Sequence, residues 1–148
     1  MSALQQFFAY AMAFEQTYDD DDWSRLEPFF ADDAVYEVRG SALACRLEGR
    51  AAILSGLRKS LDGFDRRLAK RTLDVTDGPH GEGEAVSIGW TATYVVPGAA
   101  RLLLRGRSTA RVRDGVIREL VDEYQPGMDG EVVAWLARHA PGADASYV

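Results

Sequence analysis

A change in the spacing of apolar residues near residue 64 constrains the fold of this chain more than any other feature. Before it, apolar residues recur at helical intervals, as Leu4, Phe7, Ala11 and Phe14 do. After it, they alternate with polar residues, which is typical of strands with one buried face. Helices followed by a run of strands predict an α+β domain in which helices cover one face of a sheet.

Three helices are expected ahead of the long strands. Their expected spans run from about residue 4 to the acidic run at 19–22, from Trp23 to Phe30, and from Gly49 to Leu61. Two short strands, at 34–40 and 43–48, are expected between the second and third helices.

Four strands with two-residue alternation follow the third helix. Their expected spans are 66–76, 84–96, 101–113 and 116–124, with 77–83 as a loop. In the second and third of these strands, the residues expected to face inward are Ile88, Trp90, Ala92, Tyr94, Val96, Leu104, Gly106, Ser108, Ala110 and Val112. The alternation of the last strand leaves two inner faces open: Leu120, Asp122 and Tyr124, or Ile117, Glu119 and Val121.

Length and composition indicate one globular domain over residues 1–148. The net charge of −6 argues against general nucleic-acid binding, which requires clustered positive charge. The arginines between 101 and 118 form either a solvated outer face of the sheet or a patch for an anion or partner. No segment is apolar enough to span a membrane, and the N-terminus lacks a basic signal region, so a cytoplasmic location is expected.

No motif in the chain predicts a metal ion or an organic cofactor. The acidic run at 19–22 lacks the alternate spacing, central glycine and distal glutamate of a calcium loop. His80, His139 and Cys45 are too few for a zinc site built by the protein. The glycine-rich segment at 77–83 lacks the third glycine and following helix of a dinucleotide site, so we expect no cofactor.

Four segments resemble a known family: Tyr18–Trp23, Phe29–Tyr36, Leu47–Ile53 and the hairpin Val112–Ile117. Over about residues 4–126, the chain resembles the nuclear transport factor two-like superfamily, and within it the SnoaL-like polyketide cyclases and ketosteroid isomerase-like proteins. The resemblance implies a cystatin-like roll, in which a curved mixed sheet forms a cone closed by three N-terminal helices. A short helical extension at 130–140, followed by frayed residues, is expected beyond this core.

The resemblance also implies that Asp122 and its alternate neighbours Leu120 and Tyr124 face into the cone. Ketosteroid isomerases use a helix tyrosine and two Asp residues, at positions that fall here on Phe14, Val38 and Ser108. All three positions depart from that pattern. Scytalone dehydratases use a pair of histidines, which neither histidine of this chain matches.

Limonene epoxide hydrolases resemble the chain in part. Tyr36 and Asp122 match their tyrosine and water-activating Asp. Val38, Trp90 and Ala92 stand where those enzymes carry Asn, Arg and a second Asp. The chain contains no Asn at all, so a mechanism that needs an Asn carboxamide is excluded.

SnoaL-like cyclases use an inward Asp as general acid and base, and Asp122 matches that position. A carboxyl in an apolar cone has its charged form disfavoured, which raises its pKa toward useful values. We expect Asp122 as the acid/base and Tyr36 as a hydrogen-bond donor, acting on a small polycyclic, terpenoid or polyketide-like molecule. The residues expected to line its site are Phe14, Val38, Trp90, Ala92, Tyr94, Ser108, Leu120 and Tyr124.

A non-catalytic module of the same fold is the alternative, because several partner residues of the related enzymes are replaced. Such a module would bind an apolar ligand or pair with another copy. Members of this fold often pair through their sheets, and Thr91 and Thr93 give one strand a flat outer face of small residues. We therefore expect a homodimer.

Overall fold

Helices come first and long strands follow, in the order that the spacing predicts. The computed structural model describes residues 1–148. The helices are α1 (Ala3–Asp20), the 3-10 helix η1 (Trp23–Phe29), α2 (Arg50–Gly63), the short 3-10 helix η2 (Asp65–Arg67) and α3 (Met128–His139). The strands are β1 (Phe30–Arg39), β2 (Cys45–Glu48), β3 (Lys70–Glu82), β4 (Ala85–Val95), β5 (Leu102–Arg113) and β6 (Val116–Tyr124). None of the helices has the length and apolar character needed to cross a membrane.

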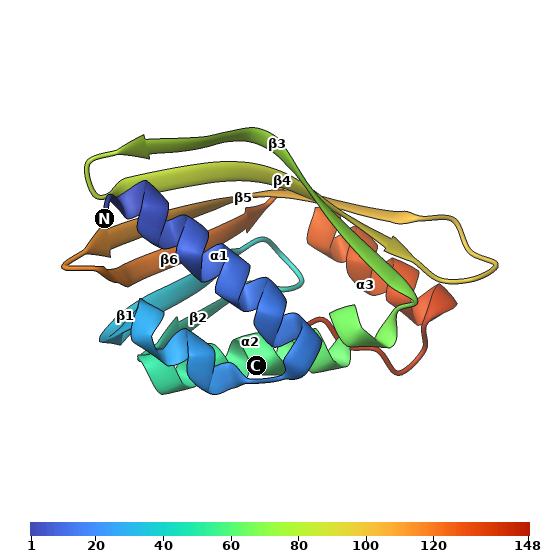
Figure 1. Cartoon of the computed structure of the whole chain (residues 1–148). Helices are drawn as coiled ribbons and strands as arrows, with labels where there is room; N and C mark the ends of the chain where they lie inside the picture. Colours follow the sequence, from blue (N-terminus) through green and yellow to red (C-terminus); the bar gives the residue numbers. More distant parts are fainter.

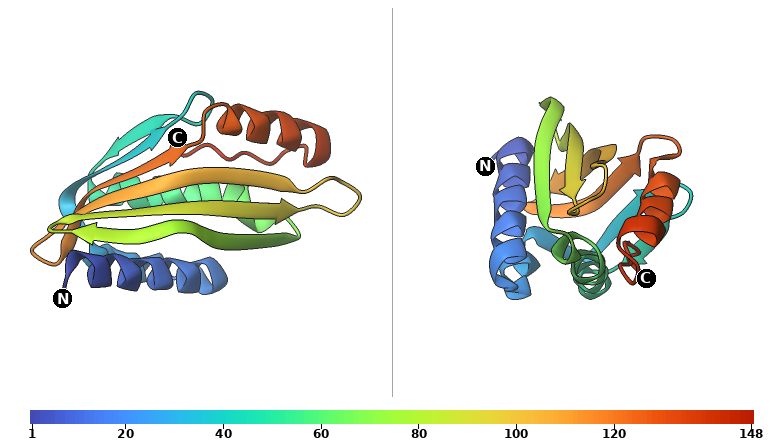
Figure 2. Two further views of the ribbon diagram at one scale, coloured as in Figure 1. Left: turned by 90° about the horizontal axis from the view of Figure 1, so that it is seen from above. Right: turned by 90° about the vertical axis from the view of Figure 1, so that its right-hand side faces the viewer.

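All strands join one curved sheet in the order β2-β1-β6-β5-β4-β3 (Figure 1). β1 runs parallel to β6, and every other neighbouring pair is antiparallel. α1 packs across β3, β4 and β5, whereas α2 packs against β1 and β2. Figure 2 shows α1 and α3 on opposite sides of the molecule, with α2 between them. The curved mixed sheet and its covering helices confirm the α+β cone, although the second of the three expected helices is a 3-10 helix.

Alternation along the strands separates the core from the solvent. In β5, Leu104 and Ala110 are buried, while Arg105 and Arg111 on the opposite face are exposed. Arg111 forms an ion pair of 3.2 Å with Glu119 of the neighbouring strand. Several arginines of this stretch therefore belong to a solvated outer face whose charge nearby carboxylates balance.

The expected loop at 77–83 is wrong, because β3 continues to Glu82. Its pairing with β4 shifts register twice, between Val75 and Asp77 and again before His80. β3 is an edge strand, so one side of its backbone needs no partner strand and can accommodate glycine, proline and bulges. The glycine-rich composition reflects these irregularities and does not end the strand.

A β-bulge resolves the two inner faces that the alternation of β6 left open. Val112 pairs with Ile117, whereas Arg111 pairs with Glu119, so Arg118 is an extra residue in β6. Because of it, Ile117 and Leu120 are both buried although three positions separate them. The observed inner face of β6 therefore combines Ile117, from one of the two predicted sets, with Leu120, from the other.

The expectation of frayed residues after the terminal helix is wrong. The C-terminal tail, residues 143–148, lies along α2, and Ala145 is buried. Ser60 Oγ donates a hydrogen bond of 2.7 Å to the Ala145 carbonyl. Alternation and helical spacing do not reveal such a segment, because its packing depends on single contacts with a distant helix.

Asp129 in α3 anchors the turn that joins β1 to β2. This residue is fully buried, and its carboxylate accepts hydrogen bonds from the Ser41 and Leu43 amides at 2.6 and 2.9 Å. Burial alone would raise the pKa of Asp129, but the hydrogen bonds from these backbone amides outweigh it, and the pKa is lowered. A side chain on Gly40 would collide with this carboxylate, so the turn requires a glycine there.

Replacing Asp129 with alanine is expected to lower the free energy of unfolding by about 2–3 kcal/mol, because the buried Leu43 amide and the partly buried Ser41 amide lose a charged acceptor. Urea unfolding at pH 7 measures the loss, and Glu131→Ala, an exposed carboxylate in the same helix turn, is the control. A lowered pKa means that the contribution of Asp129 is present above the ordinary carboxyl pKa and disappears as pH falls through the folded-state value. A difference between wild type and Asp129→Ala that does not shrink in acid would contradict this role.

Candidate functional site

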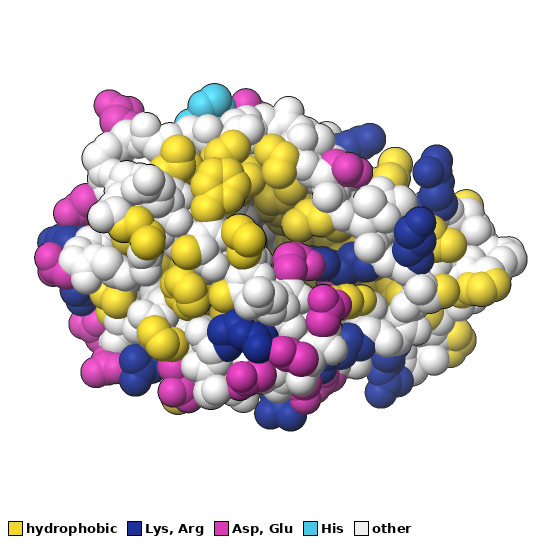
Figure 3. All heavy atoms as spheres, in the orientation of Figure 1, with side chains coloured by type: hydrophobic (Ala, Val, Ile, Leu, Met, Phe, Trp, Pro, Cys, Tyr) yellow, Lys and Arg dark blue, Asp and Glu magenta, His cyan; other side chains and the backbone are white.

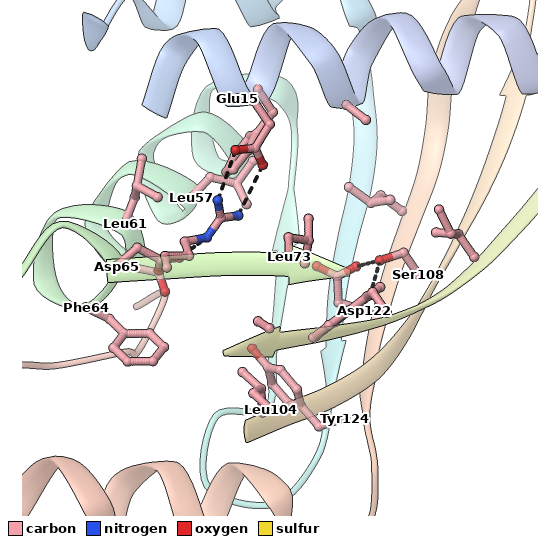
Figure 4. Close-up of a pocket in the computed structure, with 18 of the residues that line it drawn as sticks. Glu15, Leu57, Leu61, Phe64, Asp65, Leu73, Leu104, Ser108, Asp122 and Tyr124 are labelled. Carbon is pink, nitrogen blue, oxygen red and sulfur yellow. Dashed lines mark hydrogen bonds and ion pairs between the residues drawn. The ribbon is translucent and has the colours of Figure 1, made fainter. Parts of the chain in front are cut away.

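The inner face of the sheet encloses, with α1 and α2, a cavity of about 230 Å³. Figure 3 shows a hollow between α1 and β3, bordered by hydrophobic side chains, with acidic and basic side chains at its edge. Most of the residues in the cavity wall are apolar. The polar groups form two separate clusters, one around Asp122 and one around Asp65, with Leu73 between them (Figure 4).

Nine of the ten residues expected from the sequence lie in the cavity wall: Phe14, Tyr36, Trp90, Ala92, Tyr94, Ser108, Leu120, Asp122 and Tyr124. Val38 does not line the cavity, contrary to the expectation from the sequence. Its side chain is 1% exposed within the core, two positions past Tyr36 on the same face of β1. Tyr36 is the only residue of β1 in the wall, because the strand has left the cavity by position 38.

Two hydroxyl groups hold the Asp122 carboxylate from different strands. Tyr36 of β1 donates a hydrogen bond of 2.6 Å to Oδ2, and Ser108 of β5 donates one of 2.6 Å to Oδ1. Ser108 and Asp122 are direct partners in the β5–β6 register, which explains their closeness. The carboxylate forms no ion pair, so hydroxyl dipoles alone compensate its charge.

Trp90 of β4 extends this hydrogen-bond network to a further strand. Its indole N–H donates a hydrogen bond of 2.9 Å to Ser108 Oγ, which in turn donates to Asp122. A side chain at Gly106 would lie only 2.7 Å from the indole ring and the Glu123 carbonyl, so the glycine makes room for Trp90. The chain of donors from Trp90 through Ser108 fixes the direction of the hydroxyl hydrogen.

The environment of Asp122 favours its protonated form. Burial raises the pKa of this carboxyl, although the hydrogen bonds from Ser108 and Tyr36 oppose the rise. Burial and the neighbouring Asp122 charge also raise the pKa of Tyr36 well above its usual value, so the phenol remains a donor. A carboxyl with a raised pKa beside a neutral donor is suited to exchanging protons with a bound molecule.

Tyr10 and Tyr147 also lie in the cavity wall, although the sequence did not predict them there. Tyr10 is buried, its hydroxyl has no hydrogen-bond partner in the protein, and burial followed by the Asp122 charge raises its pKa. Its place between Phe7 and Phe14 in the helical stripe was a usable signal. Tyr147 gave no such signal, because it lies in the tail that was expected to fray.

A second polar cluster joins α1, η2 and β3 beside the cavity. The guanidinium of Arg71 donates two hydrogen bonds, of 3.0 and 3.2 Å, to the Glu15 carboxylate, and its Nε lies 2.9 Å from Asp65 Oδ2. The Tyr94 hydroxyl donates to the same Asp65 oxygen at 3.3 Å. Figure 4 shows Glu15 and Asp65 on one side of the cavity and Asp122 on the other.

The two clusters place carboxyl groups in contrasting surroundings. The Asp65 side chain is 13% exposed, and burial raises its pKa to about 6 even though the nearby Arg71 charge lowers it. Asp122 has hydroxyl partners only. The Asp65 cluster is therefore an ion-paired connection between elements, whereas Asp122 lines the cavity without a cation beside it.

Known proteins share this fold. Among curated proteins, none matches the sequence. A candidate polyketide cyclase from Xanthomonas campestris pv. campestris has 23% identity and a TM-score of 0.59, over 92% of this chain and 98% of that one. An LEH-like epoxide hydrolase from M. tuberculosis has 20% identity and a TM-score of 0.58, over 91% and 92%. TerC, crystallised with polyporic acid, has 15% identity and a TM-score of 0.60, over 89% and 96%.

At these identities the structural similarities establish the fold. The family itself comes from the sequence, because a family model described as the SnoaL-like domain matches residues 10–120. That match spans most of the chain, including the second part of α1 and most of the sheet. The chain belongs to the SnoaL-like domain family.

Proposed function

We propose that this protein is a cofactor-independent lyase, isomerase or cyclase that acts on a small apolar molecule bound in the cavity. The observation that carries the proposal is the Asp122 carboxyl, half-buried in an apolar wall, held by two hydroxyl donors and free of any ion pair. In this role Asp122 is the general acid and base. Tyr36 and Ser108 orient it.

The proposed chemistry begins and ends with a proton transfer. Asp122 accepts a proton from a C–H group activated by a neighbouring carbonyl, and the electron pair of that bond moves into the substrate as an enolate. In an isomerase the same carboxyl returns the proton to another carbon, and in a lyase it protonates the group that leaves with its bonding electron pair. In a cyclase the enolate carbon attacks a second carbonyl carbon, the C=O electron pair moves to oxygen, and the carboxyl protonates that alkoxide. No electron leaves the substrate, so the cycle needs no oxidant or reductant.

The names of similar proteins support this assignment. One is a candidate polyketide cyclase and another an LEH-like epoxide hydrolase, and TerC was crystallised with polyporic acid. The apolar wall around a few convergent polar groups is typical of a small-molecule site.

A second candidate function is binding without catalysis. Trp90 and Ala92 line the cavity at positions where, by the resemblance, epoxide hydrolases carry polar catalytic residues. This substitution favours a ligand-binding module. Tight binding of apolar ligands that stay chemically unchanged during long incubation would support the module over the enzyme.

Asp122→Asn is expected to slow proton abstraction by at least about 100-fold, because the amide cannot act as a base. The probe is 5-nitrobenzisoxazole: loss of its C–H proton to Asp122 breaks the ring N–O bond and releases a coloured nitrile-phenolate. Asp74→Asn, an exposed carboxylate on β3, is the matched control and should leave the rate unchanged. Equal rates for wild type and Asp122→Asn, with both proteins folded by circular dichroism, would rule out this base.

Tyr36→Phe is expected to move the pH profile of the same reaction to higher pH. The hydrogen bond from Tyr36 lowers the pKa of Asp122, so removing the phenol hydroxyl raises that pKa further. The rate of a base-catalysed reaction rises as pH passes through the pKa of the base, and the midpoint therefore increases. An unchanged midpoint would show that the Tyr36 hydroxyl does not act on Asp122.

A homodimer that pairs through the outer face of the sheet is also part of the proposal. Thr91 and Thr93 project from β4 on the face away from the cavity, where small side chains permit close approach. Light scattering should give twice the mass of the chain, and Thr93→Arg should halve the measured mass by adding charge at the interface. A dilution-independent mass of one chain for the wild type would exclude the dimer.

A further inference from the structure

The C-terminal tail lies in a groove on α2 that small residues create. Gly56, Ser60 and Gly63 follow one another at intervals of four and three, so they share one face of the helix. An added Cβ at Gly63 would collide with the Asp144 carbonyl, and one at Gly56 would lie 3.1 Å from the Tyr147 carbonyl. The tail backbone thus lies directly against the helix surface.

Hydrogen bonds hold the tail in one register. The Asp144 amide donates to the Gly63 carbonyl at 2.8 Å, and Ser60 Oγ donates to the Ala145 carbonyl at 2.7 Å. Lys59 Nζ also donates to Ser146 Oγ at 2.7 Å. Three successive positions of the tail therefore have a specific partner on α2.

This register delivers the Tyr147 side chain into the cavity wall. Its ring packs edge-on against Tyr36, with ring centroids 5.7 Å apart and an interplanar angle of 73°. Its hydroxyl lies 2.8 Å from the Tyr124 hydroxyl. Tyr36 is the residue that donates to Asp122, so the tail places a phenol directly beside the Asp122 cluster.

We propose that Tyr147 is a specificity-determining residue: its phenol fills a defined subsite next to Tyr36 and limits the size of the molecule that the cavity admits. The inference rests on the proposed function, in which this cavity binds the substrate. A bound molecule that reaches Asp122 must lie beside Tyr147. The tail, and not the strands alone, therefore forms the end wall of the site.

Two variants empty the subsite by different routes. Tyr147→Ala removes the phenol and leaves an apolar void that an aromatic molecule can occupy. Gly63→Ala substitutes no residue of the cavity wall, but its added Cβ displaces the tail, and with it Tyr147, from α2. Gly130→Ala is the matched control, because an added Cβ on that helical glycine has nothing within 4 Å. Tyr147→Phe keeps the ring and removes only the hydroxyl.

The first probe is p-cresol, which is the tyrosine side chain as a free molecule. It is expected to raise the thermal midpoint of Tyr147→Ala and Gly63→Ala in a concentration-dependent way, because it binds only the folded state. Wild type, Gly130→Ala and Tyr147→Phe should show a clearly smaller rise, since only the open part of their cavity, and not the subsite, can take p-cresol. An equal rise of the thermal midpoint in all five proteins, or no rise in any of them, would overturn the proposal that Tyr147 fills a subsite.

The second measurement compares a two-ring probe, 2-naphthol, with a four-ring probe, 1-pyrenol, by fluorescence titration. The affinity for 1-pyrenol should increase on the order of tenfold in Tyr147→Ala and Gly63→Ala, a change of about 1.4 kcal/mol. The affinity for 2-naphthol should change little. Unchanged affinity for 1-pyrenol in both variants would overturn the size limit.

These outcomes are separate from those that test the acid/base role. If Asp122→Asn reacts with 5-nitrobenzisoxazole as fast as the wild type while p-cresol stabilises Tyr147→Ala, the proposed catalysis fails and the subsite stands. If the loss of rate occurs and p-cresol has no selective effect, the catalysis stands and the role of Tyr147 fails.

Discussion

The parallel pairing of β1 with β6 joins the two halves of this chain. β1 follows the first helices and β6 ends the run of long strands, so their pairing closes the cone around the space that α1 and α2 cover. Its register pairs Tyr36 with Leu120 and brings the phenol of one half to the carboxyl of the other. The polar centre of the cavity therefore depends on a long-range contact that forms only when the whole sheet is assembled.

Two solutions to the burial of a carboxyl group coexist in one cavity. Asp65 retains a cation, and the Arg71 guanidinium links it to Glu15 and so to α1. Asp122 retains only hydroxyl partners, and its negative form is less well compensated. Ion pairing secures the elements around the cavity, whereas the unpaired carboxyl remains available to a ligand at the expense of some folding stability.

The sequence predicted the regular parts of this architecture well. Two-residue alternation placed Trp90, Ala92 and Tyr94 on the inner face of β4, because the pleat dictates that period. It could not predict the bulge at Arg118 or the continuation of β3 past residue 76, since both depend on pairing partners. Val38 was misplaced for a related reason: alternation gives the face of a residue but not how far the cavity extends along a strand. The docked tail depends on three small residues of α2, whose helical spacing places them on one face but does not indicate which segment packs there.

The hydrogen-bond chain from Trp90 through Ser108 to Asp122 has an optical consequence. The indole N–H donates to an oxygen whose own hydrogen points to the carboxyl, so a proton arriving at Asp122 changes the polarity around the indole. Trp90 thus acts as a built-in fluorophore for the charge state of this carboxyl. The other two tryptophans, Trp23 and Trp135, form hydrogen bonds elsewhere, to Asp21 and to the Ala100 carbonyl. Because the pKa of Asp21 is lowered and that of Asp122 is raised, a change in emission at the higher pH would report proton occupancy inside the cone without any added dye.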